Sequence, residues 1–208
     1  MPDVKKLSES IIAHYERHAS DWDADRRASG WNDRKWHDRF TALLPEGAAV
    51  LDLGCGGGSP VASNLVAHGM RVTGVDSSPS LVALCRTRMP EQEWIVSDMR
   101  GLRLGRAFDG ILAWDSFFHL DPDAQRAMFA TFATHAHRGT VLMFNTGPAF
   151  GEAIGNYRGD PIYHASLDRN EYRQLLAESG FRVIDQVTED PEAGGRTAWL
   201  AQAAGNLP

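Results

Sequence analysis

The sequence predicts an α/β domain with a mostly parallel sheet and helices on both faces. Short apolar runs alternate with segments of helical periodicity over residues 48–144, as in parallel strands joined by crossover helices. The first of these runs ends in a glycine cluster, and such sheets bind ligands at the carboxyl ends of their strands. The last two apolar runs are separated by a loop rather than a helix, which predicts an antiparallel pair. We therefore expect seven strands, one of them reversed.

The composition indicates a single globular domain. The chain has 208 residues, of which 43% are apolar and 23% charged, and it holds no apolar run long enough to cross a bilayer. Its first residues lack the apolar core of a secretory signal, so we expect a cytoplasmic protein with no membrane partner. Cys55 and Cys85 are then expected to be free thiols. A formal net charge of −6 provides no basic surface for a phosphate backbone, which disfavours nucleic acid as a partner.

The glycine loop after the first expected strand is the most informative stretch of the chain. Gly54, Gly56 and Gly58 allow a tight turn and a close approach of a ligand to the backbone. The preceding Asp52 leaves a carboxylate at the end of the strand, where it repels a pyrophosphate and favours a ligand with a cationic group. The dinucleotide spacing also requires glycine or alanine where the chain has Ser59. The loop therefore does not match the dinucleotide fingerprint.

The second and third expected strands also end in acids. The second strand, over residues 71–75, leads to Asp76, which lies 18 residues after Gly58. An acid about 20 residues beyond such glycines is expected to bind ribose hydroxyls. The third strand, over residues 94–96, leads to Asp98. Asp98 is a candidate ligand residue or a simple turn former.

The remaining elements follow from caps and periodicity. Ser78 and Asp121 each precede a proline and are expected to cap helices, and Gly139 is expected to end the second of these helices. Helices are expected from residue 60 to 69, 79 to 85, 122 to 139 and 170 to 178, and further strands over 110–114, 141–144, 181–187 and 197–201.

The string Asp52-Leu53-Gly54-Cys55-Gly56-Gly57-Gly58, with Asp76 and the late antiparallel strands, resembles the class I S-adenosylmethionine-dependent methyltransferases. The resemblance covers about residues 48–204 and implies a Rossmann-like, seven-stranded, mostly parallel sheet with one antiparallel strand. It implies S-adenosylmethionine as the cofactor, S-adenosylhomocysteine as the product, and no metal.

The resemblance also implies roles for residues at the strand ends. Gly54, Cys55 and Gly56 would hold the methionyl part of the cofactor, and Asp52 would lie near its ammonium group. Asp76 would bind the ribose hydroxyls, Asp98 the adenine amino group, and the Met99 backbone N–H an adenine nitrogen. The cofactor-binding candidates are Asp52, Gly54, Cys55, Gly56, Gly58, Asp76, Ser77, Asp98, Met99 and Trp114.

The segment after the fourth expected strand should border the methyl group. It lacks the motifs of amino-directed and cytosine-C5 DNA methyltransferases, which again favours a small-molecule acceptor. His119 is the candidate general base, with an ordinary pKa of about 6.5, and Asp115 a candidate to orient it or to bind the acceptor. The alternative for His119 is a packing or capping residue, in which case the reaction depends on proximity and orientation alone.

Two segments lie outside the expected sheet. Residues 1–45 carry apolar side chains at helical spacing, and Tyr15 and Trp22 resemble the aromatic N-terminal lid of small-molecule methyltransferases. Residues 46–208 would form the methyltransferase domain. Within it, residues about 145–167 are too long for a simple connection and are expected to form an irregular acceptor-binding insertion. The acceptor-site candidates in this insertion are Tyr157, Tyr163 and His164, with loop anchoring and helix capping as the alternative roles.

The sequence therefore predicts a methyltransferase of a small molecule. One alternative is an RNA or protein methyltransferase of the same fold. Another is a protein that does not methylate, either a dinucleotide-dependent oxidoreductase or a protein that only binds the cofactor. The sequence indicates neither the acceptor atom nor the oligomeric state.

Overall fold

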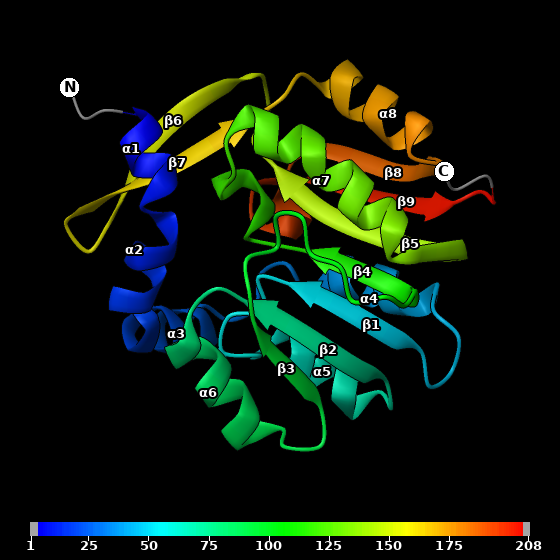
Figure 1. The fold of residues 1–208 in the computed structure, drawn as a ribbon, viewed down its shortest axis with the longest axis horizontal. Helices are drawn as coiled ribbons and strands as arrows, with labels where there is room; N and C mark the ends of the chain where they lie inside the picture. The colour runs from blue at the N-terminus through cyan, green and yellow to red at the C-terminus, as the bar shows by residue number, and fades with distance from the viewer. Residues whose placement is uncertain (1–3, 206–208) are drawn as a thin grey trace.

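A seven-stranded sheet runs through the middle of the molecule in the order β3-β2-β1-β4-β5-β9-β8 (Figure 1). The computed structural model describes residues 4–205, so the outermost residues of the two expected domains, 1–3 and 206–208, lie outside the described residues. β9 is antiparallel to both of its neighbours, and the other strands are parallel to one another, which confirms the predicted sheet. The strands are β1 (Ala49–Leu53), β2 (Arg71–Asp76), β3 (Glu93–Val96), β4 (Phe108–Ala113), β5 (Ala136–Thr146), β8 (Phe181–Asp190) and β9 (Arg196–Ala203).

Helices cover both faces of the sheet because its central strands are apolar on both sides. α7 and α8 lie in front of the sheet in Figure 1, and α4 and α5 lie behind it. Trp36 and Phe40, both fully buried, anchor α4 to the same face as α5 and α6. This part of the expected N-terminal lid is therefore a layer of the core. The helices are α4 (Arg34–Ala42), α5 (Val61–Ala67), α6 (Pro79–Arg88), α7 (Pro122–Thr134) and α8 (Arg169–Glu178).

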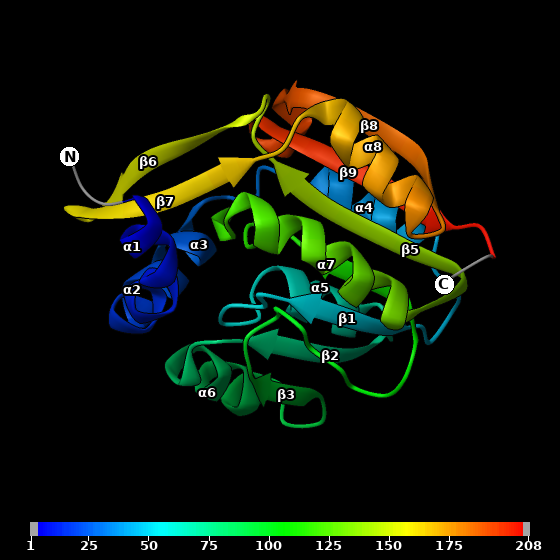
Figure 2. The ribbon, with the colours of Figure 1, turned by 45° about the horizontal axis from the view of Figure 1, so that its top comes forward.

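Three short helices and a separate two-stranded sheet lie together beyond the carboxyl ends of the parallel strands (Figure 2). The helices are α1 (Val4–Glu9), α2 (Ile11–Arg17) and α3 (Ala19–Ala28), and the strands are β6 (Gly151–Tyr157) and β7 (Asp160–Ser166). The expectation of an irregular segment over residues 145–167 was wrong. Arg158 and Gly159 both have positive φ, at 51° and 92°, which closes a two-residue hairpin turn between the strands.

Most predicted boundaries agree with the structure, and one capping residue does not. The Ser78 hydroxyl accepts from the Leu81 N–H and the Asp121 carboxylate from the Ala124 N–H, so both predicted N-caps are confirmed. Gly139 does not end α7. That helix ends at Thr134 because the buried His135 turns the chain directly into β5, which contains Gly139. Short 3-10 turns complete the fold, η1 (Phe117–His119) after β4 and η2 (Pro191–Ala193) before β9. None of the helices among residues 4–205 has the length and apolarity needed to span a membrane.

Candidate functional site

A cavity lies where the carboxyl ends of β1, β2, β3 and β4 meet the N-terminal helices. We call it the inner pocket. Parallel strands that end side by side bring residues far apart in sequence to one place, and here they bring most of the predicted cofactor residues together. The predicted residues that line the inner pocket are Gly54, Gly56, Asp76, Ser77, Asp98, Met99, Tyr15, Trp22, Asp115 and His119.

The glycine loop forms one wall of the inner pocket, and two of its glycines are required for different reasons. The N–H groups of Gly54 and Cys55 both donate to the Val75 carbonyl, which turns the chain sharply at the end of β1. Gly54 has a φ of +79°, and a Cβ there would lie 2.2 Å from the Ser116 Cβ. Gly56 has a φ of +54°, but the nearest atom to its added Cβ is the Trp22 indole nitrogen at 3.8 Å. A side chain at position 56 would therefore fill pocket space.

Asp76 is a buried carboxylate that organises the loop as well as facing the pocket. It accepts hydrogen bonds from the Gly56 N–H and the Ser78 N–H, each at 2.9 Å. Burial raises the pKa of Asp76, and these two backbone donors oppose that effect. The carboxylate is thus fixed in orientation at the end of β2, with its remaining acceptor sites available to a ligand in the inner pocket.

Asp52 lies at the bottom of a narrow extension of this space. The extension is lined by the predicted residues Asp52, Cys55, Gly58 and Trp114, together with Trp22 and Asp115, which also line the inner pocket. Asp52 is 3% exposed, and no hydrogen bond to its carboxylate is found among the described residues. Burial, with the nearby Asp76 charge adding to it, raises the pKa of Asp52 to about 7. A cation placed in this extension would stabilise the ionised carboxylate.

Asp98 and Met99 lie at the mouth of the inner pocket. Asp98 accepts from the Arg100 backbone N–H at 2.9 Å, which is the turn geometry named above as its alternative role. Its two carboxylate oxygens also pair with the Arg100 guanidinium at 2.5 to 3.0 Å. Asp98 therefore has the geometry for both predicted roles. Its carboxylate accepts the hydrogen bond that forms the turn, and the residue also lines the inner pocket.

Tyr15 and Trp22 stand between the inner pocket and a second, more open one, and line both. Their rings meet edge to face, with centroids 5.3 Å apart. The Tyr15 hydroxyl lies 2.6 Å from Nε2 of His119, whose Nδ1 lies 2.8 Å from the Tyr163 carbonyl oxygen. A carbonyl only accepts, so Nδ1 carries the proton and Nε2 accepts from Tyr15. Burial lowers the pKa of His119 to about 3, so this ring is neutral at physiological pH and the ordinary value near 6.5 does not apply.

The second pocket, which we call the outer pocket, is a cavity of about 450 Å³. Its walls are largely aromatic, and polar groups from β5, β6, β7 and β9 reach into it. Tyr157 and His164 line it as predicted. Tyr163 does not, because its side chain is 1% exposed and its hydroxyl donates to Glu152 at 2.5 Å. The side chains that line the outer pocket include Tyr15, Trp22, Asp115, Phe118, His119, Asn145, Asn156, Tyr157, Ile162, His164 and Arg196.

Several contributors to this site were missed from the sequence. Arg196, on β9, makes a bidentate pair with Asp115 at 2.6 and 2.8 Å, and Asn145 holds the same carboxylate at 2.9 Å. Arg88, on α6, pairs with Asp23 of α3 and also donates to the Gly57 carbonyl at 2.7 Å. These contacts join residues that are tens of positions apart in the sequence. In the sequence, Arg88 and Arg196 cannot be distinguished from arginines on an ordinary charged surface.

The strand ends just described lie within a segment that matches a known protein family. Residues 50–139, which hold the glycine loop, Asp76 and Asp98, match the model of a family described as a methyltransferase domain. The match covers a little under half of the chain. The matched residues include β1 to β4 with α5, α6 and α7, and they supply the strand-end residues of the inner pocket, whereas Tyr15 and Trp22 come from the N-terminal helices.

Two curated relatives are methyltransferases as well. The chain is 28% identical over 153 residues to an O-methyltransferase of Pyrenophora dematioidea, a match that covers 68% of this chain and 57% of the relative. It is 39% identical over 67 residues to a trans-aconitate 2-methyltransferase of Escherichia fergusonii, covering 31% of this chain and 26% of the relative. The chain therefore spans about half of the first relative and about a quarter of the second.

Solved structures share the whole fold at low sequence identity. A 1,6-didemethyltoxoflavin N1-methyltransferase of Burkholderia thailandensis, with S-adenosylhomocysteine bound, has a TM-score of 0.74 at 18% identity and covers 98% of this chain and 92% of its own. An amino pentose methyltransferase of Micromonospora echinaspora, with S-adenosylmethionine bound, has a TM-score of 0.70 at 22% identity and covers 88% of this chain and 96% of its own. The fold is that of the class I methyltransferases.

Proposed function

We propose that this protein is an S-adenosylmethionine-dependent methyltransferase that acts on a small molecule. The observation that carries the proposal is the arrangement of three acids at neighbouring strand ends, with the buried Asp52 in the extension and Asp76 and Asp98 lining the adjoining inner pocket. Acids along one cavity suit a ligand with hydroxyl and amino donors and a cationic end. The same acids would repel the anionic pyrophosphate of a dinucleotide.

The residues present fit the cofactor. Asp52 would pair with the ammonium group, the space over Gly56 would take the methionyl chain, and Asp76 would accept from the ribose hydroxyls. Asp98 and Met99, at the pocket mouth, would contact the adenine. The cofactor supplies a methyl group that its sulfonium makes electrophilic, so the protein mainly has to hold and align the two reactants.

The outer pocket supports a small-molecule acceptor. It opens on the other side of Tyr15 and Trp22 from the inner pocket, and its walls are largely aromatic with a few polar groups. The arginines beside the two pockets are paired with acids, Arg100 with Asp98 and Arg196 with Asp115, so they do not form a basic stripe for RNA. The relatives and structural neighbours named above, with an amino pentose or a toxoflavin precursor as substrate, support the same class of acceptor.

For His119 we propose a proton-accepting role that acts through Tyr15. Tyr15 lines both pockets, whereas the single lone pair of His119 is held by the Tyr15 hydroxyl. A hydroxyl acceptor that loses its proton during attack would pass it to the Tyr15 oxygen as Tyr15 gives its own proton to Nε2 of His119. The buried ring resists becoming charged, so this relay suits a proton that leaves late in the transfer.

Calorimetric titration of the full chain with S-adenosylhomocysteine and, separately, with NAD tests the proposal. Binding of S-adenosylhomocysteine alone is expected, and binding of NAD alone would overturn the proposal in favour of an oxidoreductase. If S-adenosylhomocysteine binds, incubation with labelled S-adenosylmethionine and a panel of small hydroxyl, amino and carboxyl compounds, RNA and peptides identifies the acceptor class. Transfer of the label to RNA or peptide alone would contradict the small-molecule assignment.

A further inference from the structure

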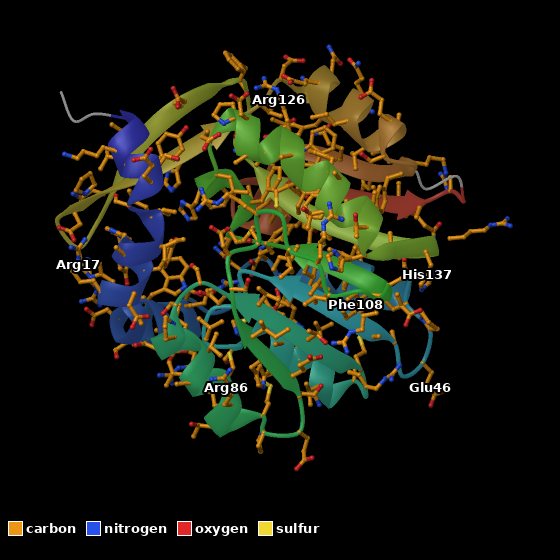
Figure 3. The ribbon with its side chains drawn as sticks, viewed as in Figure 1. Arg17, Glu46, Arg86, Phe108, Arg126 and His137 are labelled. Atoms are coloured by element: carbon orange, nitrogen blue, oxygen red, sulfur yellow. The ribbon has the colours of Figure 1, made fainter. Side chains whose placement is uncertain are left out.

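His14 of α2, His18 directly after α2 and Asp160 at the start of β7 form a compact cluster outside the two pockets. One ligand atom from each residue lies within 4.8 Å of the ligand atoms of the other two. Nε2 of His18 is 2.9 Å from Oδ2 of Asp160. The two histidine rings lie together at the end of α2, with their centroids 4.8 Å apart. Figure 3 labels Arg17 in this region, where α2 lies beside the hairpin.

The state of His14 is the second, independent observation. Its side chain is 3% exposed, and its Nε2 is buried without a hydrogen-bond partner in the described part of the chain. A buried ring nitrogen left unpaired costs free energy that a bound ligand would recover.

We infer that His14, His18 and Asp160 form a binding site for a divalent transition-metal ion, with Zn²⁺ as the best match. Two imidazoles and one carboxylate are a common donor set for this ion and leave a fourth position open to water. Mg²⁺ and Ca²⁺ prefer oxygen donors and would bind poorly. The Asp160 side chain is 39% exposed, so the ion has a path from solvent.

The charged and polar neighbours of the cluster are compatible with an ion. The Arg17 guanidinium lies 3.0 Å from Oδ2 of Asp160, but its side chain is 63% exposed and free to turn into solvent when an ion replaces it. The Tyr157 ring packs against both histidines, with centroids 6.0 and 5.5 Å away, and its hydroxyl is engaged with Asp25 at 2.7 Å. Tyr157 therefore walls the site without acting as a ligand.

A bound ion would hold α2 against the hairpin of β6 and β7. Without an ion, the end of α2 is tied to β7 at this point by the partly exposed contacts of Asp160 with His18 and Arg17. Coordination would replace them with bonds from His14 of α2 and from His18, at the junction of α2 and α3, to one ion that also holds Asp160 of β7. Tyr15 is next to His14 in the chain and would then be held against His119. The ion would therefore stabilise the arrangement in which Tyr15 stands between the two pockets.

Titration of the full chain with Zn²⁺, and with Co²⁺ as a spectroscopic probe, tests the site. We expect one ion per chain with a dissociation constant in the micromolar range or below, and a Co²⁺ spectrum without the charge-transfer band of a thiolate ligand, which would separate this site from Cys55 and Cys85. H18Q and D160N, which keep polar side chains, should each weaken binding about 10- to 100-fold. The control is H137Q, because His137 also pairs with an aspartate but lies on the opposite side of the molecule from Arg17 (Figure 3).

The thermal unfolding midpoint provides a second readout that does not depend on activity. Zn²⁺ should raise it in the wild type and in H137Q but not in D160N, because only a ligand that binds the folded state stabilises it. H14Q can be used as a third test of ion binding only if it folds, since His14 is buried. The inference is overturned if no stoichiometric binding is seen, if the Co²⁺ spectrum shows a thiolate, or if folded H18Q and D160N bind the ion as the wild type does.

Discussion

Replacing Asp52 by asparagine should make the free protein more stable and the cofactor complex weaker. Asp52 is buried without a donor, and its pKa lies at about 7 in the folded protein against 3.8 in an exposed chain. Between these values the folded state holds a proton that the unfolded state has lost, so the stability falls as the pH rises through this range. Above pH 7 the full cost is present, and it amounts to at most about 4 kcal/mol.

D52N removes the charge and keeps the shape. We therefore expect the free energy of unfolding to rise by about 1 to 4 kcal/mol at pH 8, and this gain to shrink towards zero near pH 4. Urea denaturation at several pH values, with and without ligand, measures it. A gain that does not depend on pH would show that the buried charge is not its cause.

The same substitution should weaken S-adenosylhomocysteine binding. Loss of a charge-assisted hydrogen bond is worth about 1.5 to 3 kcal/mol, which corresponds to about 10- to 100-fold in affinity. The ammonium group needs the ionised form of Asp52, so the wild-type affinity should rise with pH up to about 7 and then level off, whereas the D52N affinity should stay flat. A D52N protein that binds the ligand as tightly as the wild type, with the same pH profile, would refute the placement of the ammonium group at Asp52.

Three further substitutions test other parts of the site. D76A should weaken S-adenosylhomocysteine binding about 10- to 100-fold in a titration, and unchanged affinity in a folded variant would remove Asp76 from the site. G56V should abolish this binding, because the new side chain would enter the inner pocket. G105V is the control, since Gly105 also has a positive φ but lies outside the pocket. Normal binding by folded G56V would contradict the role of the loop. H119N should lower turnover by about 10²- to 10⁴-fold for a hydroxyl acceptor with nearly unchanged cofactor affinity, and Y15F should lower it too; a loss below about threefold in H119N would leave alignment as the whole mechanism. Because the pKa of His119 is about 3, wild-type turnover at saturating ligand should show no acidic limb from this residue near pH 6.5.

The features that could be predicted from the sequence are the local ones. Ser78 caps a helix and Asp76 ends a strand because of their immediate neighbours, so a pattern of a few residues was enough to place them. The inner pocket then followed from topology, since parallel strands must end at the same edge of the sheet.

The features that escaped prediction depend on distant contacts or on the orientation of one side chain. Tyr163 was expected at the acceptor site, but in β7 alternate side chains face opposite ways, and His164 is the one that lines the outer pocket. The cluster of His14, His18 and Asp160 joins the first helices to a hairpin about 140 residues later. Sequence alone gives no sign that the two meet.

The attachment of the N-terminal helices to α6 has a consequence for the order of events in a catalytic cycle. The Glu16 carboxylate accepts from the hydroxyls of Ser78 and Ser80 at 2.5 and 2.6 Å, and Arg88 joins Asp23 to the glycine loop. These helices are thus fastened to elements that line the inner pocket, whereas the outer pocket lies on the other side of Tyr15 and Trp22. Under the proposed function, the acceptor and its methylated product could exchange through the outer pocket while these contacts stay intact. On the same basis, this geometry predicts that the inner ligand enters before the acceptor and leaves after the methylated product.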